Sequence, residues 1–583
     1  MRKTKIVCTI GPATDDETIL RQMIKKGMDV ARLNFSHGTH EEQLERVNRI
    51  KKLRAELDIP VAILMDTKGP EIRTGRFEGG SCELIPDSEI WIRSEDILGN
   101  EKEFSVSYKS LAEDLEPGNL ILIDVGLIEL RVIDKTSTDI RCHVVNGGTV
   151  SDRKSINLPN VRVHLPALTD KDIADIMFAV ENDFDFIAIS FVRRATDVYH
   201  VREILEANKG EFIQLIAKIE NQEGVDNFAE ILDAADGIMV ARGDLGVELK
   251  AQHVPIVQKK MIEESYSKGK PSITATQMLD SMMRNPRPTR AEVSDVANAI
   301  IDGTSAIMLS GETAAGKYPI EALEMMTEIA ETTEESLDYW EIFRTGRHAA
   351  APSAAPSVTN AVSHACCTTA MDVKAKAIVA VTIGGRTARM MSRFRPECPI
   401  IAPTTSERCQ RQLNLSWGVM PVISAELTTT DELFETGMQR ALDTGLVKEG
   451  DVVVISGGTP VGVSGMTNTL KVQTIGRLLS QGVGIERGKV TGDVLIVTPE
   501  NIEELKRTGA YNMVLVVQDT DNSMIDIIKQ SRAIIAESNS EECHAVTVGK
   551  LLDIPVVYNC ENARKIFKNG MPVTVDSDRG IVN

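Results

Sequence analysis

The sequence is poor in aromatic residues, which make up only 4% of its 583 residues. Proteins that bind single-stranded nucleic acid stack bases on aromatic side chains, so this scarcity argues against that class. A net charge of −20 argues against a general nucleic-acid or anionic-membrane surface. No apolar stretch reaches the roughly 18 residues of a membrane span. We therefore expect neither nucleic acid nor membrane as a partner, and an anionic ligand would need a local cluster of basic side chains.

The cysteines lack a metal-binding or disulfide pattern. There are nine of them, an odd number, and no pair has CxxC spacing. This usage is typical of free thiols in a reducing compartment. Only Cys366 and Cys367, beside His364, are clustered, and their apolar helical pattern favours burial over metal binding. Because the N-terminal apolar run is also too short for a signal peptide, we predict a cytoplasmic protein.

The order of apolar and polar segments predicts a (β/α)8 barrel. A chain of 583 residues exceeds what one core supports, so several domains are expected. Before residue 70 and after residue 169, short apolar runs alternate with helical patterns, and the polar clusters follow the runs. Ligands collect at that end of barrel strands. The eight predicted strands are Lys5–Ile10, Asp29–Leu33, Val61–Met65, Phe186–Phe191, Phe212–Lys218, Gly237–Val240, Ser272–Thr276 and Ser305–Leu309.

Four further segments lie outside the predicted barrel. Alternating segments between Gly, Asp and Pro turns predict an inserted β domain. Residues 349–357 have the composition of a linker. An α/β segment and a last small α/β unit follow it. The predicted domains are residues 1–69 with 169–345 (barrel), 70–168 (inserted β domain), 346–473 (α/β effector domain) and 474–583 (extra C-terminal domain).

The most informative stretch is a predicted strand, helix and strand between Phe212 and Gly246. Lys218 and Glu220 end the first strand, and Asp244 follows the second. Such strands are parallel, so these side chains should meet at one sheet edge. Two carboxylates suit Mg²⁺ or Mn²⁺, and the lysine can neutralise charge on a phosphoryl or enolate oxygen. The alternative is a solvated ion pair at the strand end followed by a turn at residues 243–246.

Three glycine-rich loops are candidate phosphate sites. Gly311–Lys317 nearly matches a P-loop, but Tyr318 stands where Ser or Thr is required and Pro319 is typical of a helix first turn. We therefore reject a P-loop there. The loops Thr382–Thr387 and Ser456–Pro460 are rich in glycine and hydroxyl groups, and the first opens a helix. Together they predict a site for a phosphorylated effector.

The assembled loops resemble those of the pyruvate kinase family. The matching motifs occur in the family's order and spacing and cover residues 1 to about 472. They are Thr9–Thr14 (TIGPAT), Ala31–Gly38 (ARLNFSHG), Asp66–Arg73 (DTKGPEIR), Ser155–Pro159 (SINLP), Ala217–Asn221 (AKIEN), Val240–Glu248 (VARGDLGVE), Ala275–Met278 (ATQM) and Ser310–Ala314 (SGETA).

The resemblance implies a kinase of the last step of glycolysis, which transfers the phosphoryl group of phosphoenolpyruvate to ADP and gives pyruvate and ATP. It also assigns residues by motif match. Those implied in catalysis and substrate binding are Arg32, Lys218, Gly243, Asp244 and Thr276. Those implied in nucleotide binding are Asn34, His37, Arg73 and Lys154. Glu220 and Asp244 match the ligands of Mg²⁺ (or Mn²⁺), and Asn34, Ser36, Asp66 and Thr67 match the K⁺ site.

Two further expectations follow from the resemblance. Glu71 occupies a position that is Glu in potassium-dependent members and Lys in independent ones, so we predict potassium dependence. The effector domain resembles that of the family, which implies activation by a sugar phosphate or AMP and a homotetramer; an unoccupied pocket is the alternative. The residues implied in effector binding are Thr382, Gly384, Gly385, Arg386, Thr387, Gly458 and Thr459.

The tail departs from the common family plan. Residues 533–558 resemble the phosphohistidine domain of phosphoenolpyruvate-utilising enzymes, and His544 falls where the phosphorylated histidine would be. The usual glycine pair and hydroxyl residue are replaced by Ser538–Ser540 and Cys543. A phosphohistidine at His544 and a purely structural module therefore remain alternatives.

Two other classes of function were considered. A metal-dependent aldolase or lyase on the same barrel would use Glu220 and Asp244 to stabilise a pyruvate enolate, but it leaves the inserted domain unexplained. A non-catalytic metabolite sensor would use the effector domain and tail, but it leaves the charged barrel loops without a role. The sequence favours the kinase.

Overall fold

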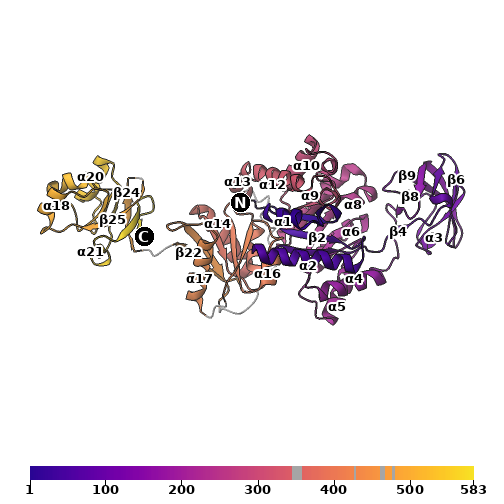
Figure 1. Ribbon diagram of the computed structural model, residues 1–583, viewed down its shortest axis with the longest axis horizontal. Helices are drawn as coiled ribbons and strands as arrows, with labels where there is room; N and C mark the ends of the chain where they lie inside the picture. The colour runs from indigo at the N-terminus through magenta and orange to yellow at the C-terminus, as the bar shows by residue number, and fades with distance from the viewer. Residues whose placement is uncertain (345–356, 426–428, 460–466, 476–478, 487) are drawn as a thin grey trace. The chain divides into compact units, whose positions relative to one another are not determined.

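The structure is a computed structural model that describes residues 1–344, 357–425, 429–459, 467–475, 479–486 and 488–583 (Figure 1). The chain forms two compact units. The first contains Met1–Met371, Ala380–Leu433 and Ser456–Thr469, and the second contains Asp372–Val379, Phe434–Ile455 and Leu470–Asn583. The predicted linker, residues 349–357, lies almost wholly outside the described residues. The predicted division into four domains stays a prediction.

Eight parallel strands in the first unit close into a barrel. They are β1 (Lys5–Ile10), β2 (Val30–Asn34), β3 (Ala62–Asp66), β13 (Phe186–Ile189), β14 (Gln214–Ile219), β15 (Gly237–Ala241), β16 (Ser272–Ala275) and β17 (Ala306–Leu309). Their order around the barrel is β1-β17-β16-β15-β14-β13-β3-β2. Strands β1, β3 and β13 are buried throughout, because the barrel interior covers one face and helices the other. The predicted (β/α)8 barrel is confirmed.

Two barrel strands end earlier than predicted. β13 stops before Ser190 and Phe191, and β16 stops before Thr276. Phe191, Thr276 and Gln277 have φ of 55°, 68° and 54°. This left-handed backbone cannot continue a strand. Each chain therefore turns sharply at the carboxyl end of its strand.

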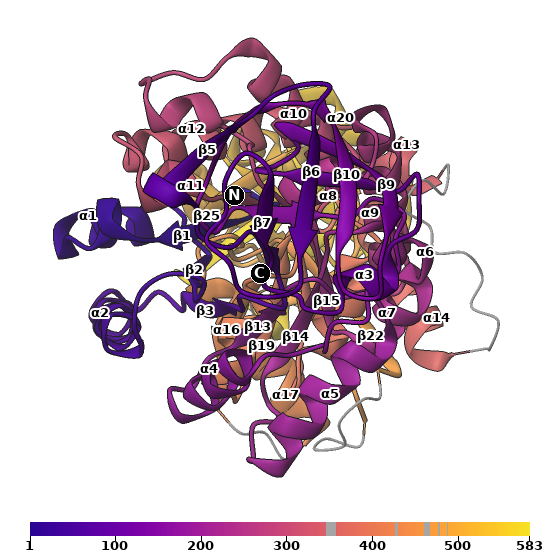
Figure 2. The same cartoon turned by 90° about the vertical axis from the view of Figure 1, so that its right-hand side faces the viewer.

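The helices connect the strands on the outside of the barrel. They are α1 (Glu17–Lys25), α2 (His40–Leu57), α4 (Asp170–Glu181), α5 (Ala195–Ala207), α6 (Gln222–Asp226), α7 (Phe228–Ala234), α8 (Arg242–Glu248), α9 (Val254–Ser267), α10 (Arg290–Ile301), α11 (Gly311–Ala314), α12 (Pro319–Glu335) and α13 (Tyr339–Arg344). α1 and α2 lie outside β1, β2 and β3 (Figure 2). Thr169 caps α4, and Asp172 completes a capping box.

The inserted β segment has its own core. One sheet has the order β4-β12-β8-β9-β10-β6-β7, and β11 pairs with β5 in a second. Ile90, Phe104 and Ile121 are among its fully buried side chains. The elements are β4 (Ile72–Arg73), β5 (Ser81–Leu84), β6 (Glu89–Arg93), β7 (Glu103–Ser105), α3 (Leu111–Asp114), β8 (Leu120–Ile123), β9 (Ile128–Lys135), β10 (Ile140–Asn146), β11 (Gly148–Ser151) and β12 (Ser155–Asn157).

The rest of the chain is α/β. Residues 358–474 hold β18 (Ala377–Ala380), β19 (Ile400–Thr404), β20 (Val419–Ile423), β21 (Val452–Gly457), β22 (Thr469–Thr474), α14 (Val358–Asp372), α15 (Arg386–Ser392), α16 (Glu407–Leu413) and α17 (Thr430–Asp443). Cys366 and Cys367 lie buried on α14, as predicted. No helix among the described residues is long and apolar enough to cross a membrane.

The C-terminal part of the second unit is an eight-stranded sheet. Its order is β23-β30-β29-β25-β26-β27-β28-β24. The elements are β23 (Ser480–Gln481), β24 (Val483–Ile485), β25 (Lys489–Ile496), α18 (Ile502–Thr508), β26 (Met513–Val517), α19 (Ile525–Ile528), β27 (Ala533–Ala536), α20 (His544–Leu552), β28 (Val556–Tyr558), α21 (Ala563–Ile566), β29 (Pro572–Asp576) and β30 (Ile581–Val582).

A buried ion pair joins α16 to the amino end of β13. Arg411 donates from Nε to Asp185 Oδ1 at 2.8 Å and from Nη2 to Asp183 Oδ2 at 2.9 Å. Asp185 is fully buried and also accepts the Ile63 N–H at 2.9 Å. Burial raises the pKa of the Asp185 carboxyl, and Arg411 opposes that rise. The Arg411 guanidinium therefore offsets part of the free-energy cost of burying the Asp185 carboxylate.

Replacing Arg411 should destabilise the first unit strongly. Arg411→Met leaves a buried carboxylate without its cation, which should lower the free energy of unfolding by about 3–5 kcal/mol. Urea unfolding followed by circular dichroism measures the change. Arg141→Met is the control, because the Arg141–Asp134 pair is exposed, and it should have a much smaller effect. Equal stability of Arg411→Met and the wild type would contradict this account.

Candidate active site

Lys218 lies at the carboxyl end of β14 among three oxygen-bearing side chains. Its Nζ is 2.9 Å from Asp66 Oδ1, 3.0 Å from Glu220 Oε1 and 2.7 Å from Ser190 Oγ. The lysine side chain is only 11% exposed. Burial lowers the pKa of Lys218, but Asp66 and Glu220 outweigh burial and hold that pKa above its ordinary value. The Lys218 ammonium group therefore stays protonated and is almost completely shielded from solvent.

Arg32 is a second cation on the same carboxylate. From β2 it donates from Nε to Asp66 Oδ2 at 2.7 Å and from Nη1 to Thr9 Oγ1 at 2.8 Å. Burial raises the pKa of Asp66, but Arg32 and Lys218 reverse that effect and leave it below its ordinary value. Asp66 thus stays ionised and fixes the positions of two positive charges.

Two carboxyl groups lie beside Lys218. Glu220 is 1% exposed and accepts the Phe191 N–H at 2.6 Å. Burial raises the pKa of Glu220, with Lys218 opposing the rise and Asp244 adding to it. Burial also raises the pKa of Asp244. These two carboxyl groups repel each other, which is the setting that a divalent cation relieves.

Asp244 lies in a helix rather than in a turn. Residues 243–246, for which a turn was the alternative, lie within α8. The Gly243 N–H donates to Thr276 Oγ1 at 2.8 Å. Arg242 holds the end of β16, because it donates to the carbonyl oxygens of Ala275 and Thr276 at 3.1 and 2.8 Å. The start of α8 and the end of β16 are thereby joined.

The residues expected at the K⁺ site lie at the ends of two paired strands. Asn34 on β2 is in register with Asp66 on β3. Asn34 Oδ1 accepts the Ser36 N–H at 3.0 Å, and Thr67 Oγ1 accepts the Ser190 N–H at 3.1 Å. Amide, hydroxyl and carboxylate oxygens from adjacent strand ends form a donor set that suits a hard cation.

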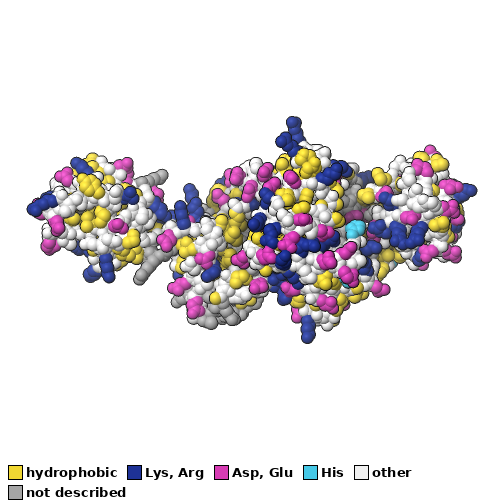
Figure 3. Space-filling model, viewed as in Figure 1, with side chains coloured by type: hydrophobic (Ala, Val, Ile, Leu, Met, Phe, Trp, Pro, Cys, Tyr) yellow, Lys and Arg dark blue, Asp and Glu magenta, His cyan; other side chains and the backbone are white. Residues whose placement is uncertain are grey.

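The residues expected on the nucleotide side are spread more widely. Arg73 pairs with Glu71 through its Nε at 2.8 Å, and Lys154 pairs with Asp124 at 2.9 Å. His37 is exposed in the loop after β2. On the face shown in Figure 3, acidic and basic side chains are interspersed rather than separated into large patches of one sign.

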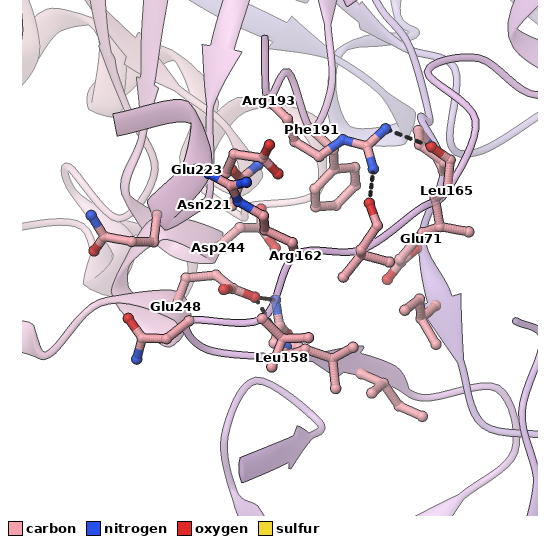
Figure 4. Close-up of a pocket in the computed structure, with 18 of the residues that line it drawn as sticks. Glu71, Leu158, Arg162, Leu165, Phe191, Arg193, Asn221, Glu223, Asp244 and Glu248 are labelled. Carbon is pink, nitrogen blue, oxygen red and sulfur yellow. Dashed lines mark hydrogen bonds between the residues drawn. The ribbon is translucent and has the colours of Figure 1, made fainter. Parts of the chain in front are cut away.

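A pocket of about 250 Å³ opens beside Asp244 (Figure 4). The segment after β12 forms one wall, and the loops after β13 and β14 form another. Arg193 donates to the carbonyl oxygens of Val163 and Leu165, both at 2.8 Å, while Glu248 accepts from Asn157 and Leu158. Among the described residues, no three His, Cys, Asp or Glu side chains form a metal cluster, so a cation at Glu220 and Asp244 needs further oxygen ligands.

The two predicted effector loops lie next to each other. The Val381 N–H donates to the Ser456 carbonyl at 3.0 Å, and the buried Thr387 hydroxyl bonds to Thr467 at 2.9 Å. Gly385 has a φ of 81° at the start of α15, while Gly384 and Arg386 are exposed. Residues 460–466 of the second loop lie outside the described residues. Gly458 precedes Thr459, whose hydroxyl bonds to Asn468 at 3.0 Å.

His544 begins α20 with both ring nitrogens in contact with partners. Its Nδ1 is 2.7 Å from Thr520 Oγ1, and its Nε2 is 3.1 Å from Asn522 Oδ1. The loop that holds these partners follows β26, and its Asp519 accepts the Ala545 N–H at 3.1 Å. The histidine thus fastens α20 to this loop.

Sequence reasoning missed three residues of the barrel site. Ser190 follows β13 and binds Lys218, Arg242 holds the end of β16, and Glu248 ends α8. Ser190 could have been predicted, because it follows a strand and polar residues after barrel strands face the site. Arg242 and Glu248 each bind a distant side chain, Asp295 and Asn157, together with main-chain groups that no residue pattern reveals.

Comparisons with known proteins agree with one another. The family described as pyruvate kinase, barrel domain, matches residues 1–323, and its alpha/beta domain matches residues 360–473. A PEP-utilising enzyme, mobile domain, matches residues 509–580. This last match is consistent with the predicted resemblance of the C-terminal tail to the phosphohistidine domain of phosphoenolpyruvate-utilising enzymes.

Whole-chain relatives point the same way. Pyruvate kinases of Sporosarcina psychrophila and Geobacillus stearothermophilus are 46% and 48% identical over 100% of this chain and 99% and 98% of their own. A crystal structure of a pyruvate kinase from Cryptosporidium parvum has a TM-score of 0.78 and 39% identity, covering 82% of this chain and 96% of its own. The chain therefore belongs to the pyruvate kinase family and is a phosphotransferase.

Proposed function

We propose that the chain transfers the phosphoryl group of phosphoenolpyruvate to ADP, giving pyruvate and ATP. The observation that carries this proposal is the placement of Lys218 between Asp66, Glu220 and Ser190 at the carboxyl end of the barrel. Phosphoryl transfer needs positioned positive charge more than covalent chemistry. A dry, permanently charged lysine supplies it without reorganisation during the reaction.

The proposed roles follow the positions of the side chains. Lys218 stabilises the transferring phosphoryl group, and Arg32 binds the substrate phosphate. The Gly243 N–H and the Thr276 hydroxyl face the substrate carboxylate, and Thr276 with a water molecule protonates the enolate. On the nucleotide side we propose Asn34, His37, Arg73 and Lys154.

We also propose two cation sites. Glu220 and Asp244 hold Mg²⁺ or Mn²⁺, which when bound neutralises phosphoryl charge, and the raised pKa values of both carboxyl groups support this assignment. Asn34, Ser36, Asp66 and Thr67 hold K⁺. Glu71 is not itself a cation, so nothing at that position replaces the ion.

Turnover should depend on both cations. ATP formation from phosphoenolpyruvate and ADP should require Mg²⁺ or Mn²⁺ and should fall by about tenfold or more when K⁺ and Na⁺ are both left out of the buffer, since loss of one bound charge costs more than about 1.4 kcal/mol. A coupled assay of pyruvate formation measures this. Full activity in potassium-free buffer would refute the Glu71 argument, and no turnover under any condition would refute the kinase.

Lys218 should matter most in the transition state. Lys218→Met should lower kcat by about 100- to 1000-fold and change KM for phosphoenolpyruvate much less, because charge develops on the phosphoryl group during transfer. Steady-state kinetics separates the two effects. Lys52→Met, which changes an exposed lysine paired with Glu17, is the control. A loss confined to KM would contradict the proposed role.

We further propose that the loops containing Thr382, Gly384, Gly385, Arg386, Thr387, Gly458 and Thr459 bind a phosphorylated effector. Their support is the contact between Thr387 and Thr467, which brings glycine- and hydroxyl-rich segments together. Exposed Arg386 offers the positive charge that a phosphate needs. The enzyme is proposed to act as a homotetramer.

A sugar phosphate or AMP should shift the saturation curve for phosphoenolpyruvate to lower concentration. The shift should be about 5- to 150-fold, the usual range of allosteric coupling. Titrating phosphoenolpyruvate with each compound of a panel identifies the effector, and Arg386→Ala should abolish the shift. Unchanged curves across the panel would favour an unoccupied pocket.

A further inference from the structure

Glu248 joins two segments that carry residues of the proposed site. Its Oε1 accepts from Asn157 Nδ2 at 3.1 Å and from the Leu158 N–H at 3.3 Å (Figure 4). One segment is α8 of the barrel, and the other is the chain leaving β12 of the inserted domain. The carboxylate is half-buried, so few water molecules compete for these hydrogen bonds.

On the barrel side, Glu248 moves with the metal-site residue. Asp244 and Glu248 are four residues apart on α8, so they lie on the same face of one short helix. Buried Leu245 anchors this helix in the barrel core, and Gly243 is bonded to Thr276. A contact at Glu248 is therefore fixed relative to Asp244.

On the inserted-domain side, the contact lies close to Lys154. Asn157 is the last residue of β12, three residues beyond Lys154. The backbone of Lys154 is itself fixed, because Thr74 and Lys154 exchange hydrogen bonds of 2.8 and 2.9 Å. A strand advances about 3.3 Å per residue, so the Glu248 contact lies within about 10 Å along the chain from Lys154.

A second contact holds the far end of the same segment. Arg193, in the loop after β13, donates to the carbonyl oxygens of Val163 and Leu165, both at 2.8 Å. The segment 157–165 is thus fastened at both ends, by Glu248 near Lys154 and by Arg193 near the return to the barrel. Of the two contacts, only that of Glu248 is made by the helix that carries Asp244.

We propose that Glu248 is a positioning residue for the nucleotide, which sets Lys154 relative to Asp244 by holding Asn157 and Leu158 against α8. This inference rests on the proposed function. Removing the carboxylate frees the inserted domain to move at its return segment, so Lys154 loses its fixed position over the bound nucleotide. The substrate side, made by Arg32 and Lys218, keeps its own contacts.

Steady-state kinetics of Glu248→Ala tests the proposal. We expect kcat/KM for ADP to fall about 10- to 100-fold, the effect of losing hydrogen bonds to a charged group, while KM for phosphoenolpyruvate changes less than about threefold. Glu248→Gln should restore most of the loss, since its amide oxygen can accept both hydrogen bonds. Asn157→Ala should give part of the loss, and the double variant should lose less than the sum of the two single variants.

A control variant and a metal-binding measurement distinguish a loss of nucleotide positioning from general damage to the site. Glu223→Ala removes another carboxylate of the same pocket, one paired with Arg194 instead, and should leave KM for ADP unchanged. Mn²⁺ binding measured by electron paramagnetic resonance should be the same in Glu248→Ala as in the wild type. An unchanged kcat/KM for ADP in Glu248→Ala, or equal losses for ADP and phosphoenolpyruvate, would overturn the proposal.

Hydrogen exchange of the Leu158 amide tests its contact with Glu248 even if the proposed function is wrong. Absence of turnover in the wild type would reject the kinase, but the Leu158 amide should still exchange faster in Glu248→Ala than in Glu248→Gln. Equal exchange in the two variants would reject the contact itself. The two failures are therefore distinguishable.

Discussion

The site depends on one ionised carboxylate, that of Asp66. It lies at the end of β3 and binds Arg32 through one oxygen and Lys218 through the other. Without it, Arg32 would lose its ion-pair partner and Lys218 would keep only Glu220, so burial of the two cations would be poorly compensated and would push their side chains outward. With it, both charges are held for a ligand that carries negative charge of its own. An acidic protein can thereby concentrate positive charge at one point.

The sequence was informative wherever the fold follows a simple rule. Lys218, Glu220 and Asp244 could be brought together in advance, because the ends of parallel strands meet at one edge of a barrel. Strands β26 and β27 are continuous apolar runs, the pattern typical of buried parallel strands. In contrast, the short antiparallel strands β29 and β30 resemble loops in sequence.

Other features of the site depend on backbone conformation and on main-chain contacts, which residue patterns do not reveal. Thr276 was predicted to continue β16, but its positive φ turns the chain and aims its hydroxyl at Gly243. Such strained conformations collect at functional sites because surrounding contacts hold them. Arg242 and Glu248 bind carbonyl oxygens and an N–H, groups that nearly every residue possesses, so most of their partners cannot be read from the sequence.

Strand β13 links two features that are otherwise far apart in the sequence. Asp185, which precedes it, binds Arg411 of α16, and Ser190, which follows it, binds Lys218. The four residues between them are fully buried and hydrogen-bonded to β3 and β14 on either side. Arg411 and Lys218 are thus bonded to opposite ends of one short strand that is held on both sides. The α16 contact at the amino end of the barrel and the ammonium group at its carboxyl end share a single rigid element.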